Sequence, residues 1–185
     1  MTVRWTGPPL RLPESLGDGV IVLDGHTLAD AEAHWASEDD EMRLRFEAPR
    51  RATLEEIRGA VQRWIDGRTA GAPMFTYALR DPQRTLMGGC EVRWLTTPDG
   101  ALNLSYWLYP QFRGHGYVGR ALMLLLGVVP AIEGARQIEA HVDPDNLASR
   151  QVAERAGFVE RGSVVDDAAW GDGKFTRIRY VRTLA

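Results

Sequence analysis

The chain has 185 residues, 44% of them hydrophobic and 25% charged, which is typical of a soluble globular domain with its own core. Its formal net charge of -3 argues against a nucleic-acid-binding protein, which needs a basic surface. The one cysteine, Cys90, cannot form a disulfide within these residues, and the apolar run Ala121–Ala131 is too short to span a membrane. We therefore expect a cytoplasmic protein with no nucleic-acid or membrane partner.

The first half of the chain predicts a loose lead-in, one strand and three helices. The lead-in covers residues 1–18, and the strand covers Val20–Gly25. A first helix follows the strand, and Met42–Phe46 predicts a short second helix. Thr53–Glu56 has the sequence of a capping box, so a third helix should begin there, with Gly67 as its C-terminal cap.

From residue 74 the apolar pattern changes to a period of two, which indicates strands. Three strands are expected, at Met74–Arg80, Leu86–Leu95 and Ala101–Tyr109, and the short turns between them make the strands antiparallel. The pair Gly88–Gly89 indicates a bulge or a close approach of two backbones within the second of these strands.

The last part of the chain alternates helices and strands. An apolar helix precedes the strand Gln137–Val142, which should lie parallel to Ala101–Tyr109 because a helix connects the two. The short helix Leu147–Gly157 and a hairpin around the loop Asp166–Lys174 follow. The expected fold is α/β (α+β), one domain over residues 1–185, with a mixed, mainly antiparallel sheet of about seven strands and helices on both faces.

A glycine-rich segment, "QFRGHGYVGR" at Gln111–Arg120, leads into the apolar helix. Its glycines allow the backbone to approach an anion, and the free N–H groups of the first helical turn point toward such a guest. Arg113 and Arg120 can add charge-assisted hydrogen bonds. The segment therefore predicts a phosphate or pyrophosphate site, with a purely structural turn as the simpler alternative.

One interpretation of this segment is a dinucleotide fingerprint. Gly114, Gly116 and Gly119 match G-x-G-x-x-G, and Glu139 follows 20 residues after the last glycine. However, antiparallel strands precede the segment, and the five residues Tyr109–Arg113 separate Leu108 of the nearest strand from Gly114. A NAD-dependent oxidoreductase is therefore only a distant alternative.

A second interpretation begins at Gln111, where the sequence reads Q-x-x-G-x-G. Tyr106–Leu122 and Ile138–Phe158 resemble the GNAT superfamily of acyl-CoA N-acyltransferases, and the second block is similar to the ribosomal-protein-alanine N-acetyltransferase branch. The resemblance implies a parallel strand pair that splays at the coenzyme site. It also implies acetyl-CoA or another acyl-CoA as co-substrate, no metal, and direct attack by a primary amine without an acyl-enzyme.

The resemblance also implies a set of coenzyme-binding residues. The backbone N–H of Leu108 would polarise the thioester carbonyl, and Asn146 and Ser149 would contact the pantetheine. Ser149 is a candidate general acid because Ala153 occupies the position where many family members have a tyrosine. The residues expected to hold the pyrophosphate are Gln111, Arg113, Gly114, His115, Gly116, Tyr117, Val118, Gly119 and Arg120.

Each of the two helix-start residues also has a simpler interpretation. Asn146 is well placed to cap the helix that follows it, and the two roles are compatible. Ser149 lies on an inward stripe with Val152, Ala153 and Ala156, so its hydroxyl needs a hydrogen-bond partner, which could be the carbonyl one turn back.

The sequence leaves three candidates for the general base, which are Glu91, His141 and a chain of water molecules. Both side chains lie on predicted strands, and the ordinary pKa of histidine suits proton transfer near neutral pH. Arg161 stands where related enzymes often have a glutamate, so no base can be carried over from the family.

The acceptor site and the acceptor are less well determined. Trp35, Met42, Phe46 and Trp170 are candidates for the pocket wall, with ordinary packing as the alternative for each. The acceptor is an amine on a protein N-terminus or on a small molecule. A non-catalytic acyl-CoA-binding sensor is the alternative function, and the acyl group and the oligomeric state, monomer or homodimer, remain open.

Overall fold

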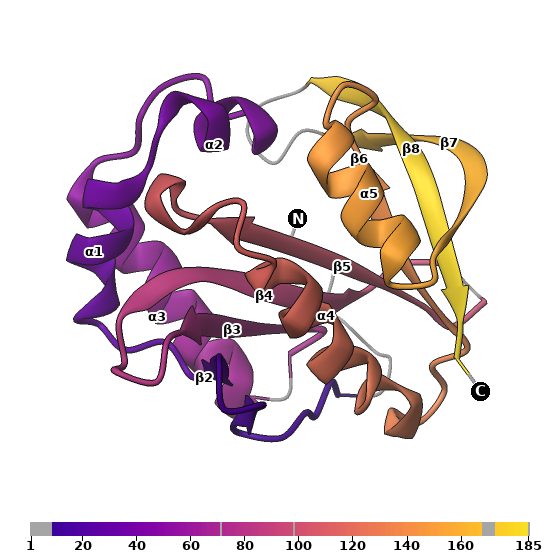
Figure 1. Ribbon diagram of the computed structural model, residues 1–185, viewed down its shortest axis with the longest axis horizontal. Helices are drawn as coiled ribbons and strands as arrows, with labels where there is room; N and C mark the ends of the chain where they lie inside the picture. Colours follow the sequence, from indigo (N-terminus) through magenta and orange to yellow (C-terminus); the bar gives the residue numbers. More distant parts are fainter. Residues whose placement is uncertain (1–8, 71, 98, 168–172, 185) are drawn as a thin grey trace.

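The computed structural model describes residues 9–70, 72–97, 99–167 and 173–184 (Figure 1). Two short 3-10 turns, Pro110–Phe112 and Val129–Ala131, flank the fourth helix. The strands and helices in chain order are β1 (Leu16–Gly17), β2 (Val22–Asp24), α1 (Asp30–Ser37), α2 (Asp40–Arg45), α3 (Leu54–Ala70), β3 (Met74–Arg80), β4 (Leu86–Trp94), β5 (Ala101–Leu108), α4 (Tyr117–Leu126), β6 (Gln137–Val142), α5 (Leu147–Arg155), β7 (Val159–Asp167) and β8 (Lys174–Thr183).

All the described strands join one eight-stranded sheet in the order β1-β2-β3-β4-β5-β6-β8-β7. β5 and β6 are parallel, and the other neighbours are antiparallel, which confirms the predicted mixed sheet. The prediction of about seven strands missed β1, a two-residue strand that pairs with β2. Such a short strand has too few residues to show a period.

The predicted loose lead-in is wrong for its described part, residues 9–18. Leu10 is only 1% exposed and packs in the main core, and its N–H donates to the carbonyl of Ala72. The hydroxyl of Tyr77 also donates to the carbonyl of Pro13. These contacts come from residues far along the chain, so the composition of the segment did not indicate them.

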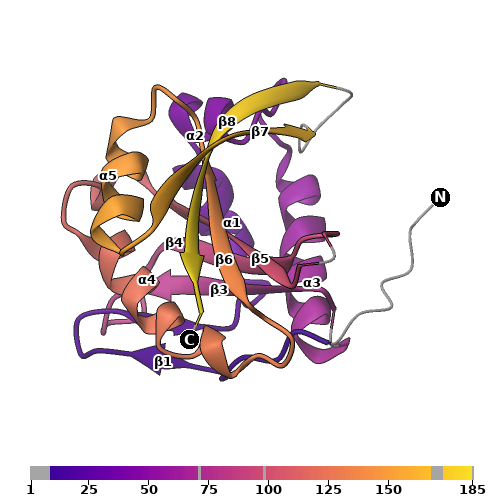
Figure 2. The same ribbon diagram turned by 90° about the vertical axis from the view of Figure 1, so that its right-hand side faces the viewer.

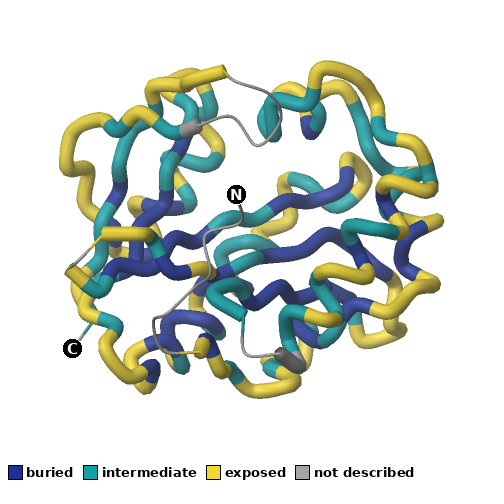
Figure 3. Tube along the Cα trace, turned by 180° about the vertical axis from the view of Figure 1, so that it is seen from behind, coloured by how far each residue is buried: buried dark blue, intermediate teal, exposed yellow. Residues whose placement is uncertain are grey.

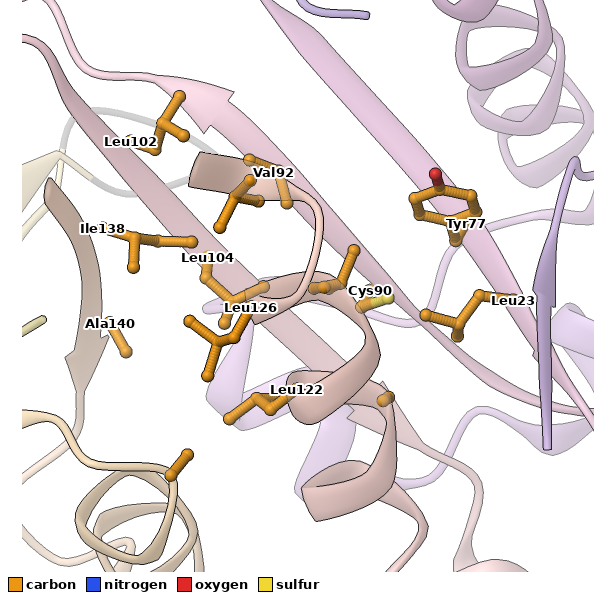
Figure 4. Packing of buried hydrophobic residues seen from close by; sticks show 14 of the residues in the cluster. Leu23, Tyr77, Cys90, Val92, Leu102, Leu104, Leu122, Leu126, Ile138 and Ala140 are labelled. Atoms are coloured by element: carbon orange, nitrogen blue, oxygen red, sulfur yellow. The ribbon is translucent and has the colours of Figure 1, made fainter. Parts of the chain in front are cut away.

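Helices cover both faces of the sheet, as predicted. Figure 2 shows α4 and α5 on one side of the strands and α3 on the other. The main core lies under α4, where Leu126 packs beside Leu104 of β5 (Figure 4). A trace coloured by burial shows that the central strands are the most deeply buried part of the chain (Figure 3). Within the described ranges, no helix is long and apolar enough to cross a membrane.

The parallel pairing of β5 with β6 is short. It runs from Ala101 opposite Gln137 to Asn103 opposite Glu139, although β5 continues to Leu108. In contrast, β4 follows β5 as far as Leu108. The two parallel strands therefore separate after Asn103, as the family resemblance implied.

Local signals explain where most helices begin and end. The capping box at the start of α3 forms, since the Glu56 carboxylate accepts from the Thr53 N–H at 2.8 Å. Gly67 does not end α3, which continues to Ala70 because Gly67 keeps a right-handed conformation. Gly157, at φ 80°, closes α5 as predicted.

Candidate active site

The glycine loop, residues 111–119, reaches α4 through two left-handed glycines. Gly114 and Gly116 have φ angles of 79° and 77°, a conformation that favours glycine. A Cβ added at either glycine, or at Gly119, would meet no atom within 4 Å. The backbone around the first turn of α4 is therefore uncovered, and its free N–H groups form a cradle that suits an anion.

The other residues that were predicted to bind the pyrophosphate are exposed or half-buried. Gln111 and His115 are exposed, and Tyr117 and Val118 rest partly on the main core. The imidazole of His115 stacks on the ring of Tyr117, with centroids 5.6 Å apart. Beside them, Gly119 and Arg120 belong to the lining of a surface cavity of ≈ 460 Å³ along α4.

Arg113 of the glycine loop and Arg120 of α4 are both paired with carboxylates in the free protein. Arg113 donates through Nη1 and Nη2 to the carboxylate of Asp39, at 2.7 and 3.0 Å, and through Nη1 to Glu41 at 2.8 Å. The Arg113 hydrogen bond lowers the pKa of Asp39. Arg120 donates to Asp18 at 2.6 Å. Pyrophosphate binding by these arginines stays a prediction, and it requires that they exchange these partners.

Leu108 presents its backbone N–H to the gap between β5 and β6. The N–H of Tyr109 donates to the carbonyl of Met87 on β4 at 2.9 Å. Since hydrogen-bonding direction alternates along an antiparallel pair, the N–H of Leu108 points away from β4. A side chain at Gly88 would collide with the carbonyl of Trp107, so this glycine allows the close approach of β4 that holds the end of β5.

Asn146 and Ser149 lie together at the start of α5. The amide oxygen of Asn146 accepts from the Ser149 N–H at 3.1 Å, so Asn146 is the helix cap. The Ser149 hydroxyl bonds the hydroxyl of Tyr106, with the oxygens 2.6 Å apart. The sequence interpretation missed Tyr106, although its alternation with Leu104 and Leu108 along β5 already placed it on the helix-facing side.

Glu91 lies on the opposite face of the sheet from Ser149. Its neighbour Cys90 points into the core under α4, and successive side chains of a strand point to opposite faces. Thr76 donates to the Glu91 carboxylate at 3.4 Å. Burial raises the pKa of Glu91, against the opposing effect of Arg93 and of the Thr76 hydrogen bond. A carboxylate with a raised pKa suits a general base.

His141 lies between two carboxylates on that same face. Its Nδ1 lies 2.9 Å from Asp166 Oδ2, and its Nε2 lies 3.0 Å from Glu139 Oε2. Burial lowers the pKa of His141, but the hydrogen bonds to both carboxylates outweigh burial and raise it. The hydrogen bonds to the two carboxylates favour the imidazolium, which cannot accept a proton, so Glu91 is the better of the two predicted bases.

The structure separates the residues proposed for the acceptor wall. Met42 and Phe46 cluster with Trp107 and Tyr109, the residues that flank Leu108. Trp35 belongs to another cluster, between α1 and α3, and its indole N–H donates to the carbonyl of Ala52 at 2.9 Å. Trp170 lies outside the described residues.

The side chain of His34 packs against Trp107 and Tyr109 of the cluster that holds Met42 and Phe46, which the sequence did not indicate. The Nδ1 of His34 lies 2.8 Å from the hydroxyl of Tyr109, and burial lowers the pKa of His34 to about 4. His34 is therefore neutral near pH 7. Across the described part of the chain, no group of three or more His, Cys, Asp or Glu side chains is arranged to hold a metal ion.

The family comparison agrees with the fold. A family model described as an acetyltransferase (GNAT) domain matches residues 21–159, more than half of the chain. No curated protein sequence gives a significant match.

Three solved structures illustrate the shared fold. RimJ of Mycobacterium smegmatis, in complex with CoA-disulfide, is 19% identical with a TM-score of 0.77, covering 92% of this chain and 88% of that one. A Salmonella typhimurium acetyl transferase that modifies the N-terminal serine of ribosomal protein L7/L12 is 20% identical with a TM-score of 0.70, covering 91% and 97%. The microcin C7 self-immunity acetyltransferase MccE, in complex with acetyl-CoA and AMP, is 14% identical with a TM-score of 0.75, covering 90% and 93%. The match of the family model over residues 21–159 shows that the chain belongs to the GNAT acetyltransferase family.

Proposed function

We propose that this protein is a cytoplasmic N-acetyltransferase that moves an acetyl group from acetyl-CoA to a primary amine. The observation that carries the proposal is the uncovered glycine loop at the start of α4, next to the point where β5 and β6 separate. The structures of MccE and RimJ, which hold acetyl-CoA and CoA-disulfide, support the choice of coenzyme. Bound acetyl-CoA would supply the activated thioester.

Different residues of the chain would then bind the coenzyme and transfer the protons. The N–H groups of the glycine loop hold the pyrophosphate, and Asn146 contacts the pantetheine arm. The N–H of Leu108 donates to the thioester oxygen, where negative charge develops during attack. Glu91 takes the proton of the amine, and Ser149 gives a proton to the sulfur that leaves.

The lone cysteine supports direct transfer to the amine. Cys90 is 1% exposed and packs in the core under α4. Burial also raises the pKa of its thiol, so the nucleophilic thiolate does not form near neutral pH. An acyl-enzyme on this residue is therefore not part of the mechanism.

The acceptor is an amine of a protein N-terminus or of a small molecule. The ribosomal-protein acetyltransferase among the neighbours favours a protein N-terminus.

Two measurements test the proposal. Isothermal titration should show binding of acetyl-CoA, and the absence of binding at about 1 mM would refute it. Release of free thiol should then be measured with peptides that begin with serine or alanine, a polyamine, an aminoglycoside and free amino acids. Binding without thiol release from any amine would favour the acyl-CoA sensor, an alternative suggested by the missing tyrosine at Ala153.

A further inference from the structure

The hydroxyl of Tyr106 connects the splayed end of β5 to the first turn of α5. Its oxygen lies 2.6 Å from Ser149 Oγ and 3.3 Å from the Ser149 carbonyl oxygen. Tyr106 follows Asn103, the last residue of β5 that pairs with β6. The phenol therefore crosses the region where the two strands have separated, on the side where α4 and α5 pack.

The position of this phenol follows from the strand pattern. Tyr106 lies opposite Cys90 of β4, and Cys90 belongs to the core under α4. Leu104 and Leu108, two residues away on either side, belong to the same core. The glycine loop leads into α4, and Ser149 begins α5, so the hydroxyl pair lies on the coenzyme side of the sheet.

Ser149 alone is a poor source for the proton that the sulfur needs. An aliphatic hydroxyl is a weaker acid than a thiol, so a serine that loses its proton leaves an alkoxide, a stronger base than the thiolate it protonated. A phenol, with an ordinary pKa of about 10, is much closer in acidity to a thiol. Burial raises the pKa of Tyr106, against the lowering effect of the Ser149 hydrogen bond. Its hydroxyl is therefore protonated near neutral pH and able to donate.

We propose that Tyr106 is a positioning residue for acyl transfer, which orients the Ser149 hydroxyl and replaces the proton that Ser149 gives away. The proposal rests on the function proposed above. When the C–S bond breaks, its electron pair stays on sulfur. The Oγ–H proton of Ser149 moves to that sulfur while the Oη–H proton of Tyr106 moves to Ser149 Oγ. Ser149 ends unchanged, and the phenolate of Tyr106 recovers a proton from water.

The sequence of α5 explains why a strand supplies the phenol. Ala153, one helical turn after Ser149, is fully buried and has no hydroxyl. The helix therefore offers Ser149 no phenol from its own inward face at that turn. Tyr106 brings a phenol to the same helix from β5 instead.

The chain offers a matched control for a variant of Tyr106. Tyr180 on β8 is also buried, and its hydroxyl also bonds α5, accepting from Arg150 Nε and donating to Glu154, each at 3.1 Å. Tyr180→Phe therefore removes a tyrosine hydroxyl bonded to the same helix without touching Ser149. Both Tyr→Phe variants should lower the thermal midpoint of the free protein by about 2–4 °C, which reflects the lost hydrogen bonds of one hydroxyl.

The experiment compares Tyr106→Phe, Ser149→Ala, the double variant and Tyr180→Phe. Tyr106→Phe should lower the single-turnover rate by about 10- to 100-fold, up to the lower end of the range of general acid catalysis, while the Kd for coenzyme A by calorimetry stays within about threefold. The double variant should be within about twofold of Ser149→Ala, because Tyr106 acts through Ser149. Tyr180→Phe should keep the wild-type rate. The dependence of the wild-type rate on the deuterium fraction of the solvent should be curved, and Tyr106→Phe should make it linear, because one proton instead of two then moves in the step that breaks the C–S bond.

Three results would overturn the inference while the proposed function stands. They are a wild-type rate for Tyr106→Phe, equal losses for both Tyr→Phe variants, and losses for Tyr106→Phe and Ser149→Ala that multiply in the double variant. Failure of the proposed function would look different, because the wild-type protein itself would then not bind acetyl-CoA in the calorimeter.

Discussion

The substitution Gly116→Asp tests the glycine loop, because its effects on folding and on binding should differ greatly. Gly116 has a φ of 77°, and a Cβ there would meet no atom within 4 Å. The only cost to the free protein should therefore be a residue with a Cβ in the left-handed region, which lowers the free energy of unfolding by about 1 kcal/mol. For a domain of this size, that corresponds to a fall of about 2–4 °C in the thermal midpoint.

The effect on acetyl-CoA binding should be far larger. The new carboxylate would face the pyrophosphate directly, and two unit charges about 4 Å apart near a protein surface repel each other by about 4 kcal/mol. This energy corresponds to a loss of about three orders of magnitude in affinity. Isothermal titration should therefore detect no binding by the variant under conditions where the wild-type protein binds.

Gly162→Asp is the matched control for this experiment. Gly162 lies in β7, has a φ of 84°, and also has open space where a Cβ would be placed. The control therefore has the same backbone strain and the same added charge outside the glycine loop. It should lower the thermal midpoint by a similar amount and leave the Kd unchanged. A Gly116→Asp variant that binds within about threefold of the wild-type, or a control that loses as much affinity, would refute the assignment of the loop.

The remaining predictions concern stability and are measured by urea unfolding. Arg80→Met removes the cation that pairs with the buried carboxylates of Asp24 and Asp30, and it should lower the free energy of unfolding by about 3–5 kcal/mol. A loss under about 1 kcal/mol would contradict this prediction. Burial raises the pKa of Asp30, but its hydrogen-bonding partners outweigh burial and hold it well below 3.8. The contribution of Asp30 to the free energy of unfolding is therefore complete above pH 3.8 and is lost as the pH falls below this value. Asp30→Asn should flatten this pH dependence. Gly89→Ala places a Cβ against the indole of Trp107 and should lower the free energy of unfolding by about 1–3 kcal/mol. Gly59→Ala in α3, where a Cβ meets only an ordinary contact, should instead raise it by about 0.5–1 kcal/mol; equal effects would contradict the overlap argument.

The sequence predicted those features that neighbouring residues determine. Met74–Arg80 and Gln137–Val142 were predicted to the residue, because alternating apolar side chains end at turn residues in both cases. The Asn146 cap and the left-handed Gly157 also depend only on residues within one helical turn. For this reason the glycine loop and the starts of α4 and α5 could be predicted from the sequence alone.

The sequence could not predict contacts between distant parts of the chain. Arg113 was expected to be available to phosphate, but Asp39, 74 residues earlier, already holds its guanidinium. The partner of Ser149 lies 43 residues earlier, on a strand that its apolar pattern identified only as core. Both contacts depend on how α2, β5 and α5 pack around the sheet, and no local pattern records that packing.

The division of chemistry between the two faces follows from the period of two in the strands. Adjacent residues of β4 place Cys90 in the core under α4 and Glu91 on the other face, so Glu91 and the Ser149 hydroxyl lie on opposite faces of the sheet. In the proposed reaction, the proton of the amine leaves on the Glu91 side, and Ser149 delivers a proton on the other side. The separation of β5 and β6 after Asn103 provides the opening between the two faces. The N–H of Leu108 points into that opening, where an amine from one face could meet a thioester held on the other. The short parallel pairing is therefore a requirement of the proposed chemistry, because pairing continued to Leu108 would close the opening and use the N–H that the thioester oxygen needs.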